Sequence, residues 1–148
     1  MTIFSVRGSL LVGALWLGIN QLSYAQANIT LEGVSSAFET QGFDTEIIGA
    51  DYILVETDSH EFLATLRGTD NDMTLISFSP VAANSMSYEN MSTFNREVKF
   101  GRVYFDTDGE VVLQMDRNAN GGITQDNISS DAATFVLLLD KLKADYAD

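Results

Sequence analysis

The sequence predicts an α+β domain, an antiparallel sheet with helices in the order α-β-β-β(-β)-α-β-β-α. Apolar residues recur at helical spacing in three segments. Between these segments they alternate with polar residues, as in strands with one buried face. Short turns join the neighbouring strand segments, which indicates antiparallel pairing. With 148 residues, of which 45% are hydrophobic, the chain can bury one core of its own.

The first predicted helix lies between Thr30 and Gln41. Thr30 is a favourable N-cap residue, and apolar side chains follow it at helical spacing. Gly42 can adopt the left-handed conformation that ends a helix in a Schellman motif. Phe43 would then pack back on Phe38, which is the contact that this motif favours.

Four strand-like segments follow the first helix. They are residues 45–48, 52–57, 60–66 and 74–78. Short turns at 49–51 and 58–59 separate the first three segments, and a polar turn at 68–72 precedes the fourth. The alternation of the fourth segment predicts a strand that ends before Pro80.

The second predicted helix follows a loop over residues 80–86. Ser87 is a suitable N-cap, and apolar side chains at helical spacing carry the helix to about Lys99. We expect Gly101 to close this helix, because glycine is the usual residue after a helix end.

A hairpin and a long helix complete the predicted fold. Segments 102–105 and 110–115 alternate on either side of Asp108-Gly109, and this dipeptide between such runs is a strong hairpin signal. From Gln125, apolar residues recur at helical spacing for about 20 residues. The sequence contains no internal repeat and no sign of a second domain.

The N-terminus predicts export. Residues 1–25 contain one arginine, an apolar run from Ser9 to Ile19, and small residues before a cleavage point after Ala25 or Ala27. The apolar run is too short to cross a bilayer. We therefore expect a signal peptide that is removed, and a mature bacterial protein that is periplasmic or secreted and not held in a membrane.

The chain is strongly acidic. Its 8 Lys and Arg residues against 21 Asp and Glu residues give a net charge of −13, and removal of the leader with its arginine gives 7 − 21 = −14. This charge repels phosphates and anionic lipid, so it disfavours nucleic-acid binding. It favours cationic partners at long range, or serves only solubility or tolerance of salt.

Four segments carry motifs in a characteristic order and spacing: residues 94–106, 108–109, 111–113 and 121–124. By this order and spacing the chain resembles the YbjN family, also called the bacterial sensory-transduction regulator family. The resemblance covers residues 29–146 and implies a type III secretion chaperone-like fold and a binding or regulatory domain without catalysis. The chain departs from the family in having Phe94-Asn95 where Trp-Asn is frequent, and in lacking the cysteines that some members carry. Its leader also contrasts with the many cytoplasmic members.

Residues 116–127 match the spacing of a twelve-residue calcium loop. The matching positions are Asp116, Asn118, Asn120, Gly121, Ile123 and Asn127. Such a loop takes its strongest ligation from a bidentate glutamate in its last position, where Asn127 offers one neutral oxygen. We therefore predict a strand, a turn at Gly121-Gly122 and a helix capped by Thr124, with a calcium-responsive loop as the alternative.

Arg96, Lys99 and Arg102 concentrate positive charge in an acidic chain. They are candidate contacts for an anion or for the carboxylates of a partner. Arg96 and Lys99 are three residues apart on a predicted helix, so they are expected to share a face. The alternative is a set of weak surface ion pairs with Glu97 and the acidic hairpin turn.

Catalytic chemistry has little support in the sequence. His60 is the single histidine, and we expect it in an exposed turn, because no nucleophile or orienting acid is marked for it. With no cysteine, zinc and thiol chemistry lack a set of ligands. We predict no catalytic residue, no metal and no cofactor, with a site assembled in space from Ser and Asp side chains as the alternative.

The last helix has a broad apolar face. Val136, Leu137 and Leu138 widen its stripe beyond what a one-sided surface helix needs. Val136 and Leu138 are therefore candidate contacts with a protein or peptide partner, or with a second copy in a homodimer. The alternative is a helix set deeply against its own sheet. The sequence thus favours a binding module that uses its sheet or this helix.

Overall fold

Six antiparallel strands form one open sheet in the computed structural model, which describes residues 29–147. In chain order the elements are α1 (Leu31–Glu39), β1 (Asp44–Ile48), β2 (Tyr52–Glu56), β3 (Glu61–Arg67), β4 (Asp72–Phe78), the 3-10 helix η1 (Ala83–Ser85), α2 (Tyr88–Glu97), β5 (Gly101–Phe105), β6 (Val111–Arg117) and α3 (Gln125–Tyr146). This order confirms the predicted α+β class, with the optional fourth strand present. The predicted signal peptide, with both cleavage points, lies outside the described residues.

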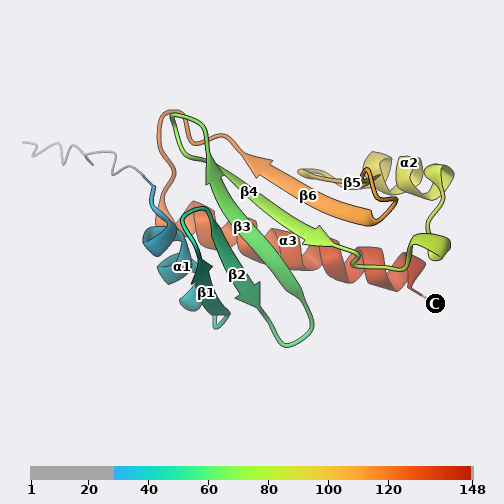
Figure 1. Cartoon of the computed structure of the whole chain (residues 1–148), viewed down its shortest axis with the longest axis horizontal. Helices are drawn as coiled ribbons and strands as arrows, with labels where there is room; N and C mark the ends of the chain where they lie inside the picture. The colour runs from blue at the N-terminus through green and yellow to red at the C-terminus, as the bar shows by residue number, and fades with distance from the viewer. Residues whose placement is uncertain (1–28, 148) are drawn as a thin grey trace, which may run out of the picture.

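The helices gather on one side of the sheet. The strand order is β1-β2-β3-β4-β6-β5, and in Figure 1 the strands cross in front of α3, with their other face toward the viewer. Helix α1 packs on α3 and β1, while α2 lies beside the edge strand β5. The sheet therefore has one covered face and one uncovered face, which we call the open face.

The hydrophobic core lies between the covered face and α1 and α3. Phe62 of β3 sits at its centre, with its ring 6.3 Å from that of Phe38 and 5.1 Å from that of Phe135, both in edge-to-face geometry. All three rings are at most 2% exposed. Burial of a side chain of this size stabilises the fold by about 1.5–3 kcal/mol, so these rings anchor both helices to the sheet.

The start and end of α1 follow the prediction. The Thr30 hydroxyl accepts a hydrogen bond from the Gly33 N–H at 3.1 Å. At the other end Gly42 has φ 82°, and the Phe43 N–H donates to the Phe38 carbonyl at 3.3 Å. This is the Schellman arrangement, in which the N–H groups of a left-handed glycine and of the next residue donate hydrogen bonds to carbonyls at the helix end.

The end of α2 differs from the prediction. The helix ends at Glu97, and Gly101 is the first residue of β5, so it does not close the helix. Phe100 takes the left-handed conformation instead, with φ 71°. A Cβ on Gly101 would lie 2.6 Å from Leu138 Cδ1 of α3, so the glycine leaves room for the Leu138 side chain. Leu138 thus packs over the start of β5.

Candidate functional site

The open face has an apolar centre. Cross-strand register places Leu54 of β2 opposite Leu63 of β3, and Leu63 opposite Ile76 of β4. All three side chains are half-buried, and none belongs to the core between sheet and helices. Phe78, two residues from Ile76 on the same face, is 51% exposed. The open face therefore presents apolar side chains where a one-sided sheet would place polar ones.

Carboxylates flank this apolar centre. Asp44 of β1 lies opposite Glu56 of β2, which lies opposite Glu61 of β3, so three carboxylates stand abreast across three strands. Glu46 lies opposite Leu54, beside the apolar row. All four acids are exposed. We call Asp44, Glu46, Glu56 and Glu61 the acidic flank.

The two arginines on the open face, Arg67 and Arg102, pair with residues that do not belong to the acidic flank. Arg67 donates to the Tyr52 hydroxyl at 2.8 Å and lies over its ring at 5.8 Å. Arg102 lies 3.3 Å from Asp116 on the opposite side of the sheet centre from the acidic flank. Among residues 29–147, no ion pair involves a member of the acidic flank. The open face thus combines an apolar centre with acids that have no internal counter-charge.

A buried hydroxyl on this face also has no partner. Thr65 of β3 lies between Tyr52 and Thr74 in the cross-strand register and is only 4% exposed. Its hydroxyl is the one buried side-chain polar atom of the described residues without a hydrogen bond. Native structures satisfy nearly all such groups, so Thr65 is an exception, and it lies on the open face.

One outer edge of the sheet is closed by a side chain. Asn95 of α2 accepts from the Val103 N–H at 2.7 Å and donates to the Val103 carbonyl at 2.9 Å. The amide therefore takes both backbone groups that a further strand would need at this position of β5. Asn95 thereby blocks strand pairing at this position of β5.

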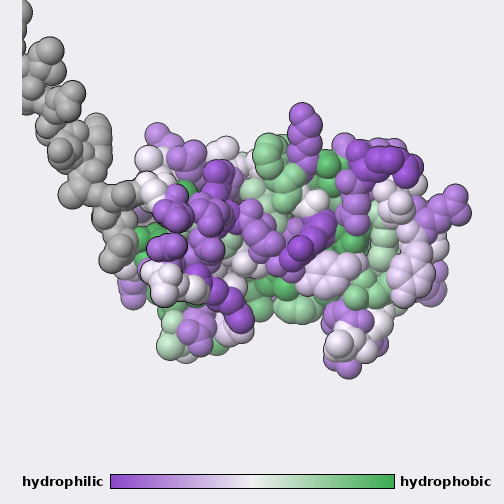
Figure 2. All heavy atoms as spheres, turned by 90° about the horizontal axis from the view of Figure 1, so that it is seen from above, coloured by the Kyte–Doolittle hydropathy of each residue, from purple (hydrophilic) through white to green (hydrophobic). Residues whose placement is uncertain are grey.

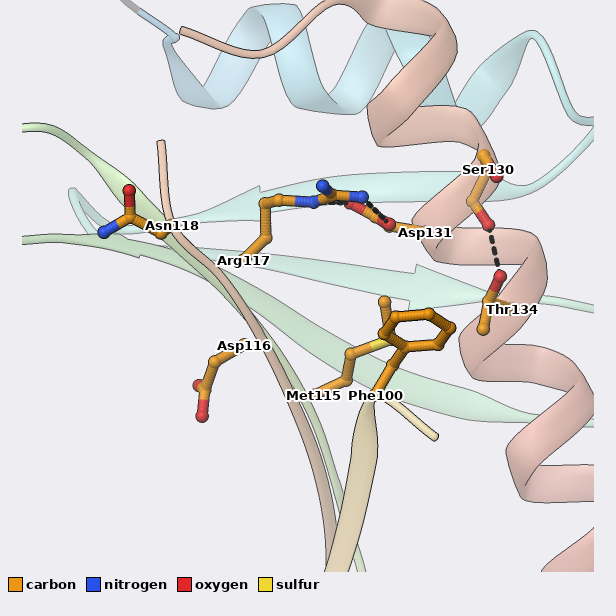
Figure 3. A pocket seen from close by; sticks show the side chains of 8 residues that line it. All are labelled: Phe100, Met115, Asp116, Arg117, Asn118, Ser130, Asp131 and Thr134. Atoms are coloured by element: carbon orange, nitrogen blue, oxygen red, sulfur yellow. Dashed lines mark hydrogen bonds and ion pairs between the residues drawn. The ribbon is translucent and has the colours of Figure 1, made fainter. Parts of the chain in front are cut away.

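A pocket of about 340 Å³ opens between the β5–β6 end of the sheet and α3 (Figure 3). Arg117 of β6 reaches across it to Asp131 of α3, with Nε 2.6 Å from Oδ2 and Nη2 2.5 Å from Oδ1. Phe100 and Met115 lie on one side, whereas Asp116 points away from the Arg117–Asp131 pair. Figure 2 shows the molecule from above, where hydrophilic areas alternate with smaller hydrophobic areas.

The Arg117–Asp131 pair is a structural joint. Asp131 is 4% exposed, whereas the side chain of Arg117 is 37% exposed. The hydrogen bond to Asp131 raises the pKa of Arg117 above its ordinary value, an effect that outweighs the opposing effect of burial. The guanidinium and the carboxylate satisfy each other, so this pocket holds β6 to α3 and offers no uncompensated charge from this pair.

His60 is buried, so the expected exposed turn position is wrong. Its Nε2 lies 2.6 Å from Asp140 Oδ1 of α3, in a pocket of about 230 Å³ beside the β2–β3 turn. The residue is 8% exposed, because α3 covers the turn. No hydroxyl of residues 29–147 hydrogen-bonds to the ring, so the pair has the orienting acid of a catalytic triad but no nucleophile.

The three predicted cationic candidates do not come together. Because α2 ends at Glu97, Lys99 lies beyond the helix and shares no helical face with Arg96, which corrects that expectation. Arg96 donates to the Thr93 hydroxyl at 3.2 Å. Arg102 pairs with Asp116 of β6, while Glu97 pairs with Lys141 of α3 at 3.2 Å. The cluster in sequence is thus divided among separate elements.

The apolar candidates of α3 also have different environments. Leu138 is 7% exposed and packs over Gly101, so the monomer buries this predicted partner contact in its own core. Val136 is half-buried and lines the pocket beside His60. The exposed member of the stripe is Leu137, at 67%. The helix is therefore set against its own sheet over most of the predicted stripe.

Residues 116–127 form the predicted strand, turn and capped helix. Strand β6 runs to Arg117, Gly121 and Gly122 have φ 88° and 82°, and the Thr124 hydroxyl accepts from the Asn127 N–H at 3.2 Å. Asp116 accepts from Thr74 across the strands, on the open face. Within residues 29–147, no group of three or more His, Asp or Glu side chains is arranged to hold a metal ion.

Sequence reasoning named the sheet as a possible binding surface but not its residues, and it missed the Arg117–Asp131 and His60–Asp140 pairs. The signal for the open face was present, because strands β2, β3 and β4 carry apolar residues at both parities and not at alternate positions alone. The acid pairs left no local signal. His60 and Asp140 are 80 residues apart in the chain, and only the packing of α3 brings them together.

A comparison with protein families matches residues 30–142 to the YbjN family, described as "putative bacterial sensory transduction regulator". A comparison with curated proteins found no match to this chain. Within residues 29–147, no helix has the length and apolar character required to span a membrane.

Proposed function

The chain belongs to the YbjN family, and from this premise we propose that it is an exported, non-enzymatic binding domain that holds a protein or peptide partner on the open face. The observation that carries the proposal is the apolar centre formed by Leu54, Leu63 and Ile76, with Phe78 beside it. Contiguous apolar side chains at a surface favour an interaction site. The family description, which is regulatory, supports the same reading.

The titratable groups support a binding role over catalysis. The buried acid Asp131 is held by Arg117, and the ring of His60 is held by Asp140. A nucleophile and its base must lie within hydrogen-bond reach of each other, and neither pair provides such an arrangement. These groups instead join α3 to β6 and to the β2–β3 turn.

Export is supported by the leader sequence. The apolar run and the small residues before Ala25 and Ala27 are typical of a cleaved signal. Mass spectrometry of the protein purified from cell fractions tests this part of the proposal. We expect an N-terminus at Gln26 or Asn28 and recovery outside the cytoplasm, and an intact Met1 in the cytoplasmic fraction would contradict export.

Site-specific photo-crosslinking in the native host tests the partner. We would place a benzoylphenylalanine at Phe78 on the open face and, as a matched control, at Tyr88 on α2. Both positions are exposed aromatics, at 51% and 79%, so the probe changes little at either. We expect protein adducts from position 78 and not from position 88. Absence of adducts from position 78, or equal adducts from both, would contradict binding on the open face.

A further inference from the structure

The acidic flank is an unusual arrangement for a free protein. Like charges directly opposite each other on neighbouring strands destabilise a sheet. Asp44, Glu56 and Glu61 stand abreast in this way, and the ion pairs of the described residues leave all three without a counter-charge. A bound group with positive charge would remove this repulsion.

The apolar centre lies directly beside these acids. Leu54 and Glu56 are two residues apart on β2, and Leu63 and Glu61 are two residues apart on β3. The acidic row and the apolar row therefore run in parallel across the strands, about 6.6 Å apart. Each row has one side chain per strand, so its members repeat at about 4.8 Å.

This spacing fits one face of an α-helix lying across the strands. Residues three and four apart on a helix are about 5–6 Å from each other, close to the strand repeat. A helix with a basic stripe beside an apolar stripe would place Lys or Arg side chains over the acidic row and apolar side chains over Leu54, Leu63 and Ile76. The arginines of the open face would not repel the basic stripe, because Arg67 is held by Tyr52 and Arg102 by Asp116.

We propose that the open face binds a basic amphipathic helix of a partner protein, laid across β1 to β4. This inference rests on the proposed binding function and adds the chemistry and orientation of the partner. A second copy is a poor occupant, because the chain carries a net charge of −13 and would bring its own acids to the acidic flank. Anionic lipid is repelled for the same reason.

Calorimetric titration of the mature protein with synthetic peptides tests the inference. The first probe is a Leu/Lys amphipathic helix of about 18 residues, which spans about 27 Å. The second has Glu in place of Lys, and the third has the Leu/Lys composition in an order without separate stripes. We expect binding of the first probe, weakened by salt, no binding of the second, and at least about tenfold weaker binding of the third.

Two sets of substitutions with the same charge change locate the site. The test set is Asp44→Asn, Glu56→Gln and Glu61→Gln on the acidic flank. The control set is Glu32→Gln, Glu89→Gln and Asp126→Asn, each in the first turn of one helix. We expect about tenfold weaker binding of the Leu/Lys helix by the test set, because three exposed ion pairs are lost, and less than about threefold by the control set.

The melting temperature separates lost contact from lost folding. Because the test set removes like-charge repulsion, we expect it to melt at or above the temperature of the unaltered protein while it binds less tightly. Ile76→Thr is a second variant, which tests the apolar row. It is expected to weaken binding also at high salt, where charges are screened.

Equal losses from the two sets would overturn the inference, because they would show a general attraction to an acidic chain. If the third probe bound as tightly as the first, the proposal that the partner segment is an amphipathic helix would be overturned. Failure of the Leu/Lys helix to bind, with protein adducts still formed from position 78, would overturn the basic helix and leave the proposed function standing. Absence of those adducts would remove the proposed function itself.

Discussion

Arg117→Met is expected to destabilise the domain more than Asp131→Leu does. Methionine keeps the apolar stem but leaves Asp131, 4% exposed, as a buried carboxylate without a counter-charge. In the opposite variant Arg117, whose side chain is 37% exposed, can turn its charge toward water. Breaking a buried pair so that a charge remains buried costs about 3–5 kcal/mol, and we expect this for Arg117→Met. For Asp131→Leu we expect about 1–3 kcal/mol.

Urea unfolding followed by circular dichroism measures both values. With a slope of about 2 kcal/mol per molar urea, a loss of 4 kcal/mol lowers the midpoint by about 2 M. The double variant removes both charges and is expected to recover part of the loss, since a buried pair can often be replaced by apolar residues. A loss below about 1 kcal/mol for Arg117→Met, or a larger loss for Asp131→Leu, would refute the assignment of this pair as the joint between β6 and α3.

Four further outcomes are expected. Phe100→Gly should raise the free energy of unfolding by about 1 kcal/mol in urea, because it relieves a left-handed backbone; a loss would show that the exposed ring packs usefully. Gly101→Ala should lower the melting temperature because the Leu138 side chain must shift, and the same substitution made in a Leu138→Ala background should lower it by less. The hydrogen bonds that Lys141 donates to the carboxylates of Asp145 and Glu97 raise its pKa, so the stability lost in Lys141→Met should be constant from about pH 6 to pH 10.5 and vanish as the pH rises beyond it; a difference that persists at higher pH would contradict this. Millimolar calcium should leave the melting temperature unchanged if residues 116–127 form only a turn, and an increase would favour the calcium-responsive alternative.

The parts of the fold that depend on neighbours in the chain were predictable. The cap at Thr30, the Schellman turn at Gly42 and the turn before Thr124 each follow from residue types with a local conformational preference. The end of α2 was not predictable, because sequence rules assign a left-handed conformation to glycine. In the structure Phe100 adopts this conformation, while Gly101 leaves room for Leu138 of α3.

The candidate site depends on contacts between distant segments, so the sequence predicted it only in part. Proximity in the chain suggested that Arg96, Lys99 and Arg102 act together. In the structure Arg96 lies in α2, Lys99 in the connection that follows it, and Arg102 in β5. The acidic row arises from strand register, which joins Asp44 to Glu61 through β2. A shift of one residue would turn these side chains to the other face, and the composition alone does not fix that choice.

The Asn95 amide on Val103 limits how far copies of this protein can join edge to edge. Of the two terminal strands, β5 is capped and β1 alone can accept another strand. If two copies joined through β1, their combined sheet would present a capped strand at each outer end. Edge-to-edge growth would then stop at a pair, which would protect this cysteine-free chain from fibrous polymerisation by this route.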